Sequence, residues 1–152
     1  MTSYQGNHDL LNICTLAPVI PVLVVDEISK AVPLAKALIT GGLRVLEVTL
    51  RTDNALAVIK EMVNNNAEGI IGAGTLLSEN DVYAAKKAGA KFGVSPGATE
   101  QIMRACAEVN LPLLPGAATP SEVMSLLSKG YSVQKFFPAE SNGGVKALKS
   151  IL

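Results

Sequence analysis

Hydrophobic positions along the chain follow two alternating patterns: short apolar runs rich in β-formers, and longer stretches whose apolar residues recur at helical spacing. The runs predict strands, because side chains alternate between the two faces of a strand. The stretches predict helices, whose period is about 3.6 residues. The predicted strands are Pro18–Val25, Arg44–Leu50, Ile70–Thr75, Lys91–Pro96, Leu111–Gly116 and the start of the stretch Val133–Glu140.

Helix signals lie between these strands. Residues 1–17 are interpreted as an N-terminal leader with a short helix around residues 10–16, and further helices are predicted at 28–40, 53–65, 78–89, 99–109, 119–129 and 143–152. Asp53, together with Thr52, is the predicted N-cap of the helix at 53–65, because short polar side chains accept hydrogen bonds from the first free N–H groups. Ser78, Thr99 and Thr119 are the first residues of the next three predicted helices.

The regular alternation of strand and helix predicts a parallel sheet covered by helices. Two architectures satisfy this pattern, an open doubly wound sheet and a (β/α) barrel. A doubly wound nucleotide-binding domain carries a glycine fingerprint after its first strand, whereas this chain has Val25-Asp26-Glu27 there. The glycines of Gly72-Ala73-Gly74 lack a third partner and are weak support for that class.

The faces of the second strand favour the barrel. Val45, Glu47, Thr49 and Arg51 share one face, and the alternate residues of the strand are all apolar. Both faces of an open parallel sheet meet helices and are apolar. One face of a barrel strand looks into the interior, and catalytic groups gather at the carboxyl ends of the strands. We therefore predict an α/β fold, a (β/α)8 TIM barrel of which this chain supplies about six βα units.

Composition excludes several classes of protein. With 152 residues, 49% of them hydrophobic and 17% charged, the chain has the size and composition of one globular domain. Its 13 basic and 13 acidic residues leave no net charge, which argues against a nucleic-acid partner. No apolar run is long enough to span a membrane and the N-terminus lacks a secretory pattern, so a cytoplasmic location is expected. One histidine and two cysteines, Cys14 and Cys106, argue against a zinc site or a catalytic thiol.

Lys135 is the residue around which the candidate site is built. It shares a strand face with Val133 and Phe137 in an otherwise apolar run. Desolvation lowers the pKa of a buried amine, and the neutral amine is the nucleophile that attacks carbonyl carbons. The plainer alternative is a lysine whose ammonium reaches water from the end of the strand.

Four further residues lie late in their predicted strands or just beyond them. Glu47 is suited to general acid/base chemistry, and Arg51 to binding a substrate carboxylate in a bidentate fork. Thr75 can donate a hydrogen bond to the same carboxylate. The alternatives are a structural ion pair between Glu47 and Arg51, and an ordinary β-branched strand residue at Thr75. For Pro96 a turn-forming role is favoured over a ligand contact.

Five segments together resemble a known family. RVLEVTLRT (44–52), IIGAGT (70–75), VSPG (94–97), LPGAATPSE (114–122) and KFFPAESNGGVKALK (135–149) closely resemble bacterial 2-keto-3-deoxy-6-phosphogluconate (KDPG) aldolase, which is also 4-hydroxy-2-oxoglutarate aldolase. The resemblance runs from about Pro18 to the end of the chain. It implies a cytoplasmic class I Schiff-base aldolase without metal or cofactor, a (β/α)8 barrel that usually assembles as a homotrimer.

The same resemblance implies roles for individual residues. Lys135 would be the Schiff-base lysine, Glu47 the general acid/base, and Arg51 and Thr75 the ligands of the pyruvate carboxylate. Pro96 and Phe137 would line the pocket. The implied reactions are cleavage of the phosphorylated keto acid to pyruvate and glyceraldehyde 3-phosphate, in the Entner–Doudoroff route, and of 4-hydroxy-2-oxoglutarate to pyruvate and glyoxylate.

Two alternatives to this function stay open. The enzyme could act on a related 2-keto-3-deoxy sugar acid. The chain could also be a non-catalytic barrel fragment, because it stops inside the sixth predicted crossover helix while a barrel needs eight strands. We expect a truncated piece of a longer protein, with the edges of its first and last strands exposed. We assign no phosphate-binding residue, since the family's phosphate loops follow its last two strands.

Overall fold

A computed structural model describes residues 6–66 and 68–151 of the chain. Within these residues the chain forms an α/β fold with one parallel sheet, whose strands follow one another in sequence order. The strands are β1 (Val22–Leu23), β2 (Val45–Thr49), β3 (Ile70–Gly74), β4 (Gly93–Ser95), β5 (Leu113–Ala117) and β6 (Lys135–Phe136).

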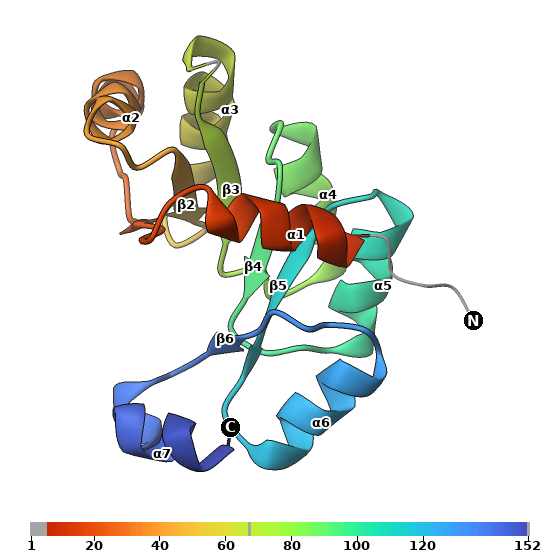
Figure 1. Cartoon of the computed structure of the whole chain (residues 1–152). Coiled ribbons are helices and arrows are strands. Elements are labelled where there is room, and N and C mark those ends of the chain that lie inside the picture. Colours follow the sequence, from red (N-terminus) through yellow and green to blue (C-terminus); the bar gives the residue numbers. More distant parts are fainter. Residues whose placement is uncertain (1–5, 67, 152) are drawn as a thin grey trace.

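Helices connect and cover the strands (Figure 1). They are α1 (Gly6–Thr15), α2 (Ala31–Thr40), α3 (Ala55–Asn65), α4 (Glu79–Lys87), α5 (Glu100–Glu108), α6 (Pro120–Ser128) and α7 (Gly144–Ile151), with 3-10 turns η1 (Ile28–Lys30) and η2 (Glu140–Asn142). Ser78, Thr99 and Thr119, predicted to start their helices, are the N-caps, and each accepts a hydrogen bond from the third N–H of the following helix. In α4 and α6 the acidic third residue also closes a capping box.

The two faces of the sheet belong to two different apolar clusters. Leu46, Val48, Ile71 and Ala73 lie in the larger cluster, against the helices. Val45 alternates with Leu46 and belongs to the smaller cluster on the opposite face. Glu47 and Thr49 follow Val45 on this second face and are also buried. The alternation predicted for the second strand is confirmed, and its polar face is the concave interior of a half-barrel.

Helix α1 closes the interior near the starts of the strands. Its Leu10 is buried with Val45, Phe92 and Val94. Figure 1 shows α1 crossing in front of β3, β4 and β5. The leader predicted at residues 1–17 is therefore helical over Gly6–Thr15, and its residues 1–5 lie outside the described part of the chain. An apolar floor at this end leaves the opposite end, where the strands finish, for polar groups.

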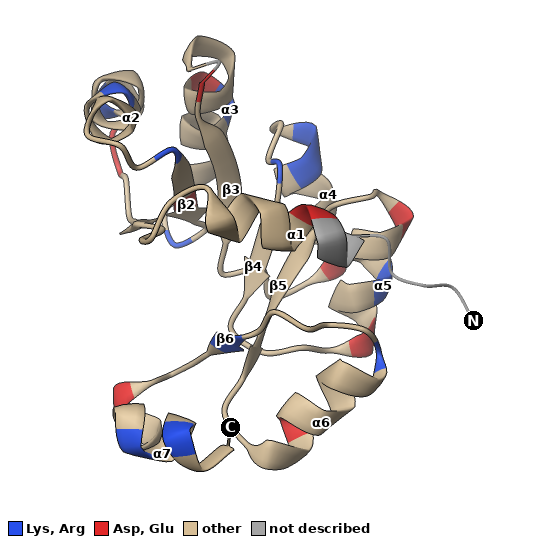
Figure 2. Ribbon diagram, in the orientation of Figure 1, with Lys and Arg blue, Asp and Glu red and all other residues tan. Residues whose placement is uncertain are grey.

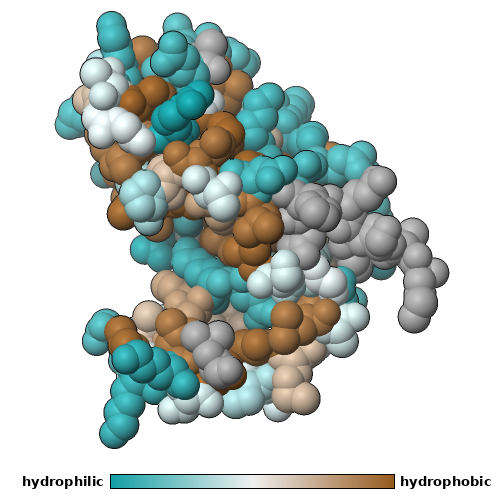
Figure 3. All heavy atoms as spheres, viewed as in Figure 1, coloured by the Kyte–Doolittle hydropathy of each residue, from teal (hydrophilic) through white to brown (hydrophobic). Residues whose placement is uncertain are grey.

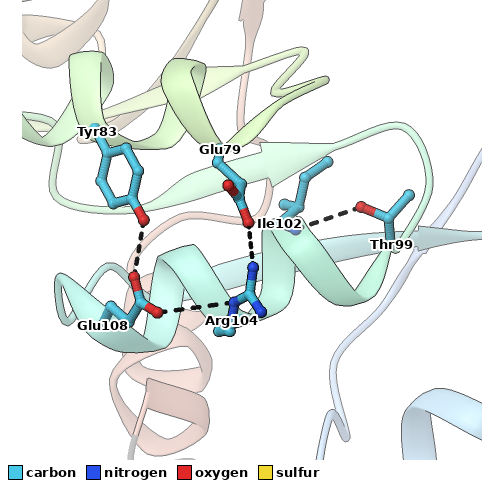
Figure 4. A network of polar contacts seen from close by, with 6 residues as sticks. All are labelled: Glu79, Tyr83, Thr99, Ile102, Arg104 and Glu108. Carbon is cyan, nitrogen blue, oxygen red and sulfur yellow. Dashed lines mark hydrogen bonds and ion pairs between the residues drawn. The ribbon is translucent and has the colours of Figure 1, made fainter.

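Charged side chains tie the outer helices together. Arg104 of α5 donates to Glu79 of α4 at 2.7 Å, and the Tyr83 hydroxyl donates to Glu108 at 2.8 Å (Figure 4). These contacts are exposed, so each contributes little to the free energy of folding. Figure 2 shows that acidic and basic residues lie mostly on helices and turns. This network is structural and remote from the concave face.

The structure corrects one predicted cap. Asp53 and Thr52 do not cap the helix at 53–65: its N-cap is Asn54, without a side-chain cap hydrogen bond. The Thr52 hydroxyl instead donates to the carbonyl of Val25, and the Asn54 amide donates to the carbonyl of Asp26. These hydrogen bonds join the β2–α3 turn to the segment that follows β1 and hold the two segments together.

The sheet has two free edges among the described residues. β1 pairs with β2, β6 pairs with β5, and the strand order ends at each. Val19, Val22 and Val24, in and around β1, are more than half exposed. Figure 3 shows hydrophobic surface among polar residues on the face that carries α1. The observed architecture is thus a parallel six-strand half-barrel. None of the described helices is long and apolar enough to cross a membrane.

Candidate active site

Lys135 and Glu47 meet across the concave face. The Lys135 Nζ lies 3.4 Å from Glu47 Oε1. Lys135 opens β6 and Glu47 is the middle residue of β2, with three strands between them in the sheet. Four strand spacings in a flat sheet would separate the two backbones by about 19 Å, too far for such contact. The curvature of the half-barrel is therefore what forms this pair.

The two members of the pair differ in exposure. The Glu47 side chain is 4% exposed and that of Lys135 is 25% exposed. Lys135 therefore has one side open to an incoming molecule, whereas the carboxylate lies behind it. The plainer alternative, a lysine that reaches water from the end of the strand, fits the partial exposure of Lys135, but its nitrogen also lies beside a buried carboxylate. An amine in this position can form an imine with a carbonyl compound, and the neighbouring carboxylate can accept or donate the protons of that reaction.

The interior glycines make room for this arrangement. A Cβ on Gly74 would lie 2.7 Å from both Cγ and Cδ of Glu47. A Cβ on Gly72 would overlap the ring of Phe92, and one on Gly116 would overlap the carbonyl of Pro96. The sequence pattern offered Gly72 and Gly74 as weak support for a nucleotide-binding fingerprint. Their specific neighbours follow from strand register and curvature, which no local sequence signal contains.

Phe137 lies on the same face as Lys135, as the alternation predicted. The Lys135 Nζ is 5.3 Å from the centroid of the Phe137 ring, within the range of a cation–π contact. Val133, two residues earlier, packs with the interior cluster. Gln134 points the other way, and its amide donates to carbonyls of Val123 and Tyr131. The ring and the amine thus form one wall of the site.

Arg51 and Thr75 follow the ends of adjacent strands, β2 and β3. The Arg51 side chain is exposed, and in the described part of the chain Glu47 pairs with Lys135 rather than with Arg51. The proposed structural pair between Glu47 and Arg51 is therefore wrong. Thr75 has a positive φ of 63°. A β-branched residue in this left-handed region is strained by about 1–3 kcal/mol, and such strain clusters at functional sites.

Pro96 directly follows β4, and its carbonyl turns in front of Gly116 of β5. The preceding Ser95 is buried, and its hydroxyl donates to the carbonyl of Gly97. This hydrogen bond folds the chain sharply after the strand. Pro96 therefore stands in a bend directly after β4, which agrees with the turn-forming role that the sequence favoured, and it is half-buried.

Other reactive groups lie apart from this site. Burial raises the pKa of the Cys106 thiol to about 12 and also raises that of Cys14. Both thiols are therefore protonated at neutral pH and are poor nucleophiles. Among residues 6–66 and 68–151, no three His, Cys, Asp or Glu side chains lie close enough to hold a metal ion.

Comparison with known sequences identifies the chain's relatives. A family model described as KDPG and KHG aldolase matches residues 10–152. The KHG/KDPG aldolase of Escherichia coli (strain K12) is 49% identical over 140 residues, which make up 92% of this chain and 66% of that protein. The 2-dehydro-3-deoxy-phosphogluconate aldolase of Dickeya dadantii is 47% identical over 91% of this chain and 65% of its own length. The chain spans just under two thirds of these curated relatives.

Solved structures give the same result. The KDPG aldolase of Zymomonas mobilis ZM4, solved with 3-phosphoglycerate, superimposes with a TM-score of 0.90 at 45% identity, covering 95% of this chain and 69% of that one. The KDPG aldolase of Legionella pneumophila, solved with pyruvate as a covalent carbinolamine intermediate, gives 0.87 at 43% identity over 91% of this chain and 68% of that one. The resemblance expected from the five sequence segments is confirmed.

Proposed function

The chain belongs to the KDPG and KHG aldolase family, and from this premise we propose that it supplies the imine-forming half of a class I aldolase, a carbon–carbon lyase. The observation that carries the proposal is the Lys135–Glu47 pair: a partly open amine 3.4 Å from a buried carboxylate on the concave face. The Legionella relative captured with pyruvate as a carbinolamine supports the same chemistry.

The proposed reaction begins at the Lys135 nitrogen. The amine adds to the keto carbon, the carbinolamine loses water, and a protonated imine results. Glu47 then takes the proton of the substrate hydroxyl, and the electrons of the neighbouring carbon–carbon bond move into the imine. An aldehyde leaves and an enamine stays on Lys135. Protonation of the enamine carbon and addition of water release pyruvate and restore the free amine.

The remaining site residues have binding roles in this proposal. Arg51 and Thr75, at the ends of adjacent strands, bind the carboxylate of the pyruvate part. Phe137, whose ring lies beside the Lys135 nitrogen, excludes water from one side of the imine. Pro96 lines the rim. The strained backbone of Thr75 supports a functional rather than purely structural role for that residue.

The proposed substrates are 2-dehydro-3-deoxy-6-phosphogluconate, giving glyceraldehyde 3-phosphate, and 4-hydroxy-2-oxoglutarate, giving glyoxylate. The names of the relatives, KHG/KDPG aldolase and 2-dehydro-3-deoxy-phosphogluconate aldolase, support both. An aldolase for a related 2-keto-3-deoxy sugar acid would use the same imine chemistry. Assaying cleavage of all three substrate types separates these specificities.

We further propose that the described half-barrel is one incomplete domain of a closed (β/α)8 barrel in a cytoplasmic homotrimer. The free edges of β1 and β6 and the exposed valines around β1 support closure by further strands. Extending the chain to the length of its relatives should bury Val22 and Val24. Amide hydrogen exchange of β1 would measure the resulting protection, and light scattering would give the number of subunits.

The first test of function is pyruvate with borohydride, followed by intact mass and peptide mapping. A reduced adduct on Lys135 supports a working imine site. A folded chain without an adduct contradicts activity of the 152-residue chain. Repeating the reaction on the extended chain then separates an incompetent fragment, which gains the adduct on extension, from an ordinary barrel lysine, which does not.

A further inference from the structure

The space that a side chain on Gly74 would occupy is filled by the side chain of Glu47. A Cβ at position 74 would overlap Oε1 and approach both Cγ and Cδ within 2.7 Å. The overlap therefore involves not only the carboxylate oxygen but also Cδ and Cγ of Glu47. Turning the carboxylate about its last bond cannot relieve the overlap, because Cγ stays in place during that rotation.

Strand register explains why Gly74 is the neighbour of Glu47. Glu47 pairs with Gly72 across the β2–β3 ladder, and Thr49 pairs with Gly74. The Glu47 side chain therefore leans diagonally over β3 toward the carboxyl ends of the strands, which is also the direction of Lys135. Gly72 on the same face meets a different group, the Phe92 ring in the apolar floor.

We propose that Gly74 is a positioning residue, whose missing side chain allows the Glu47 carboxylate to cross β3 and reach Lys135. The catalytic consequence of this inference rests on the proposed function, whereas the steric contact between Gly74 and Glu47 does not depend on that function. Alanine at 74 forces Glu47 into another rotamer, since the overlap includes Cγ. The carboxylate then leaves the amine, and proton transfer at the imine slows while Lys135 itself is unchanged.

The test compares Gly74→Ala with Gly72→Ala, the same change on the same face of the same strand. Exchange of the pyruvate methyl protons in D2O, followed by NMR, reports proton transfer, and borohydride trapping reports the imine. Gly74→Ala should slow exchange by about 10-fold or more while the final amount of adduct is retained. The pH dependence of the exchange rate in Gly74→Ala should resemble that of Glu47→Ala, because in both variants the carboxylate no longer lies beside the amine. Gly72→Ala should lower thermal stability, through Phe92, and keep the wild-type pH profile.

A double-mutant cycle with Glu47→Ala isolates the interaction. Without the long side chain at 47 the three atoms nearest to the new methyl group are gone, so Gly74→Ala should change exchange and melting temperature little in that background. Equal effects of Gly74→Ala in both backgrounds, or an unchanged exchange rate and pH profile in the single variant, would overturn the proposal.

The cycle keeps the two proposals distinguishable. If the wild-type chain neither exchanges nor traps pyruvate, activity of the 152-residue chain is contradicted, and the melting temperatures alone still test whether Gly74→Ala acts through Glu47. If Gly74→Ala does not fold, the double variant must fold at least as well as Glu47→Ala alone. A double variant that also fails to fold would show that Gly74 serves another neighbour.

Discussion

Lys135 Nζ and Glu47 Oε1 lie 3.4 Å apart although 88 residues separate them in the sequence. The Glu47 carboxylate is almost fully buried, whereas the side chain of Lys135 is partly exposed on the open side of the half-barrel. Removing one member of such a pair leaves the other without compensation. The pair therefore links the chemistry of the site to the stability of the strands that carry it.

Lys135→Ala should abolish the borohydride-trapped pyruvate adduct, because no other group replaces the attacking amine. Intact mass with peptide mapping measures the adduct. Lys146→Ala, an exposed lysine of α7, is the control and should trap pyruvate like the wild type. Adduct formation at the wild-type level in Lys135→Ala would assign the imine to another lysine.

Glu47→Gln should slow exchange of the pyruvate methyl protons by roughly 10²–10⁴-fold, since the amide keeps the shape of the side chain but cannot accept the proton. The melting temperature should also fall, because Lys135 loses its charged partner although the space over Gly74 stays filled. An exchange rate equal to that of the wild type would leave Glu47 as the structural partner of Lys135.

Local signals predicted much of the fold. Ser78, Thr99 and Thr119 each precede their helix, and the cap is a contact within three residues. The alternation around Glu47 likewise predicted which face is buried and polar. These features depend on residues that are close together in the chain, so they can be predicted from a single sequence.

Features that depend on distant segments were not predictable in this way. The side chains of Thr52 and Asn54 donate to carbonyls 27 and 28 residues earlier, so neither side chain caps the start of α3. The fit of Glu47 over Gly74 needs the β2–β3 register and the curvature of the sheet together. The site residues were predicted from their places along the strands, whereas the distances between them depend on the curvature of the half-barrel.

Arg51→Ala should raise the pyruvate concentration needed for half-maximal trapping by roughly 10–100-fold, the effect of losing a hydrogen bond to a charged group. The adduct formed at saturating pyruvate should be unchanged. Arg44→Ala is the matched control: this arginine stands just before the same strand, at its opposite end, and donates to the carbonyl of Glu68. Equal half-saturation in wild type and Arg51→Ala would remove Arg51 from the carboxylate site.

Glu122 gives the fold a pH dependence at α6. Hydrogen bonds from the Ala118 N–H, the Thr119 hydroxyl and the Thr119 N–H hold the pKa of this carboxyl below its ordinary value of 4.5. The folded state therefore favours the ionised form, and this stabilisation is present above about pH 4.5 and is lost as the pH falls through the lowered pKa. Glu122→Gln should lower the melting temperature at pH 7 and have little effect near pH 2. A difference that grows toward acid pH would contradict this account.

Thr75 provides a test in which backbone and side chain act separately. Its φ of 63° is unfavourable for any residue with a Cβ and costs glycine little. Thr75→Gly should therefore be more stable than Thr75→Ala by about 1 kcal/mol, the reverse of the order at an ordinary strand position. Urea unfolding of the two variants measures the difference. A more stable alanine variant would show that the residue does not hold this conformation.

Pyruvate binding should respond to the same two substitutions in a different way. Both variants lack the hydroxyl, so both should need roughly 10-fold or more pyruvate for half-maximal trapping, the effect of one hydrogen bond to a carboxylate. Thr75→Ser keeps the hydroxyl and is the control that should bind as the wild type does. If glycine and alanine differ in binding as they do in stability, the strained backbone itself positions the ligand. If neither changes binding, the hydroxyl lies outside the carboxylate site and the strain at Thr75 serves the turn into α4.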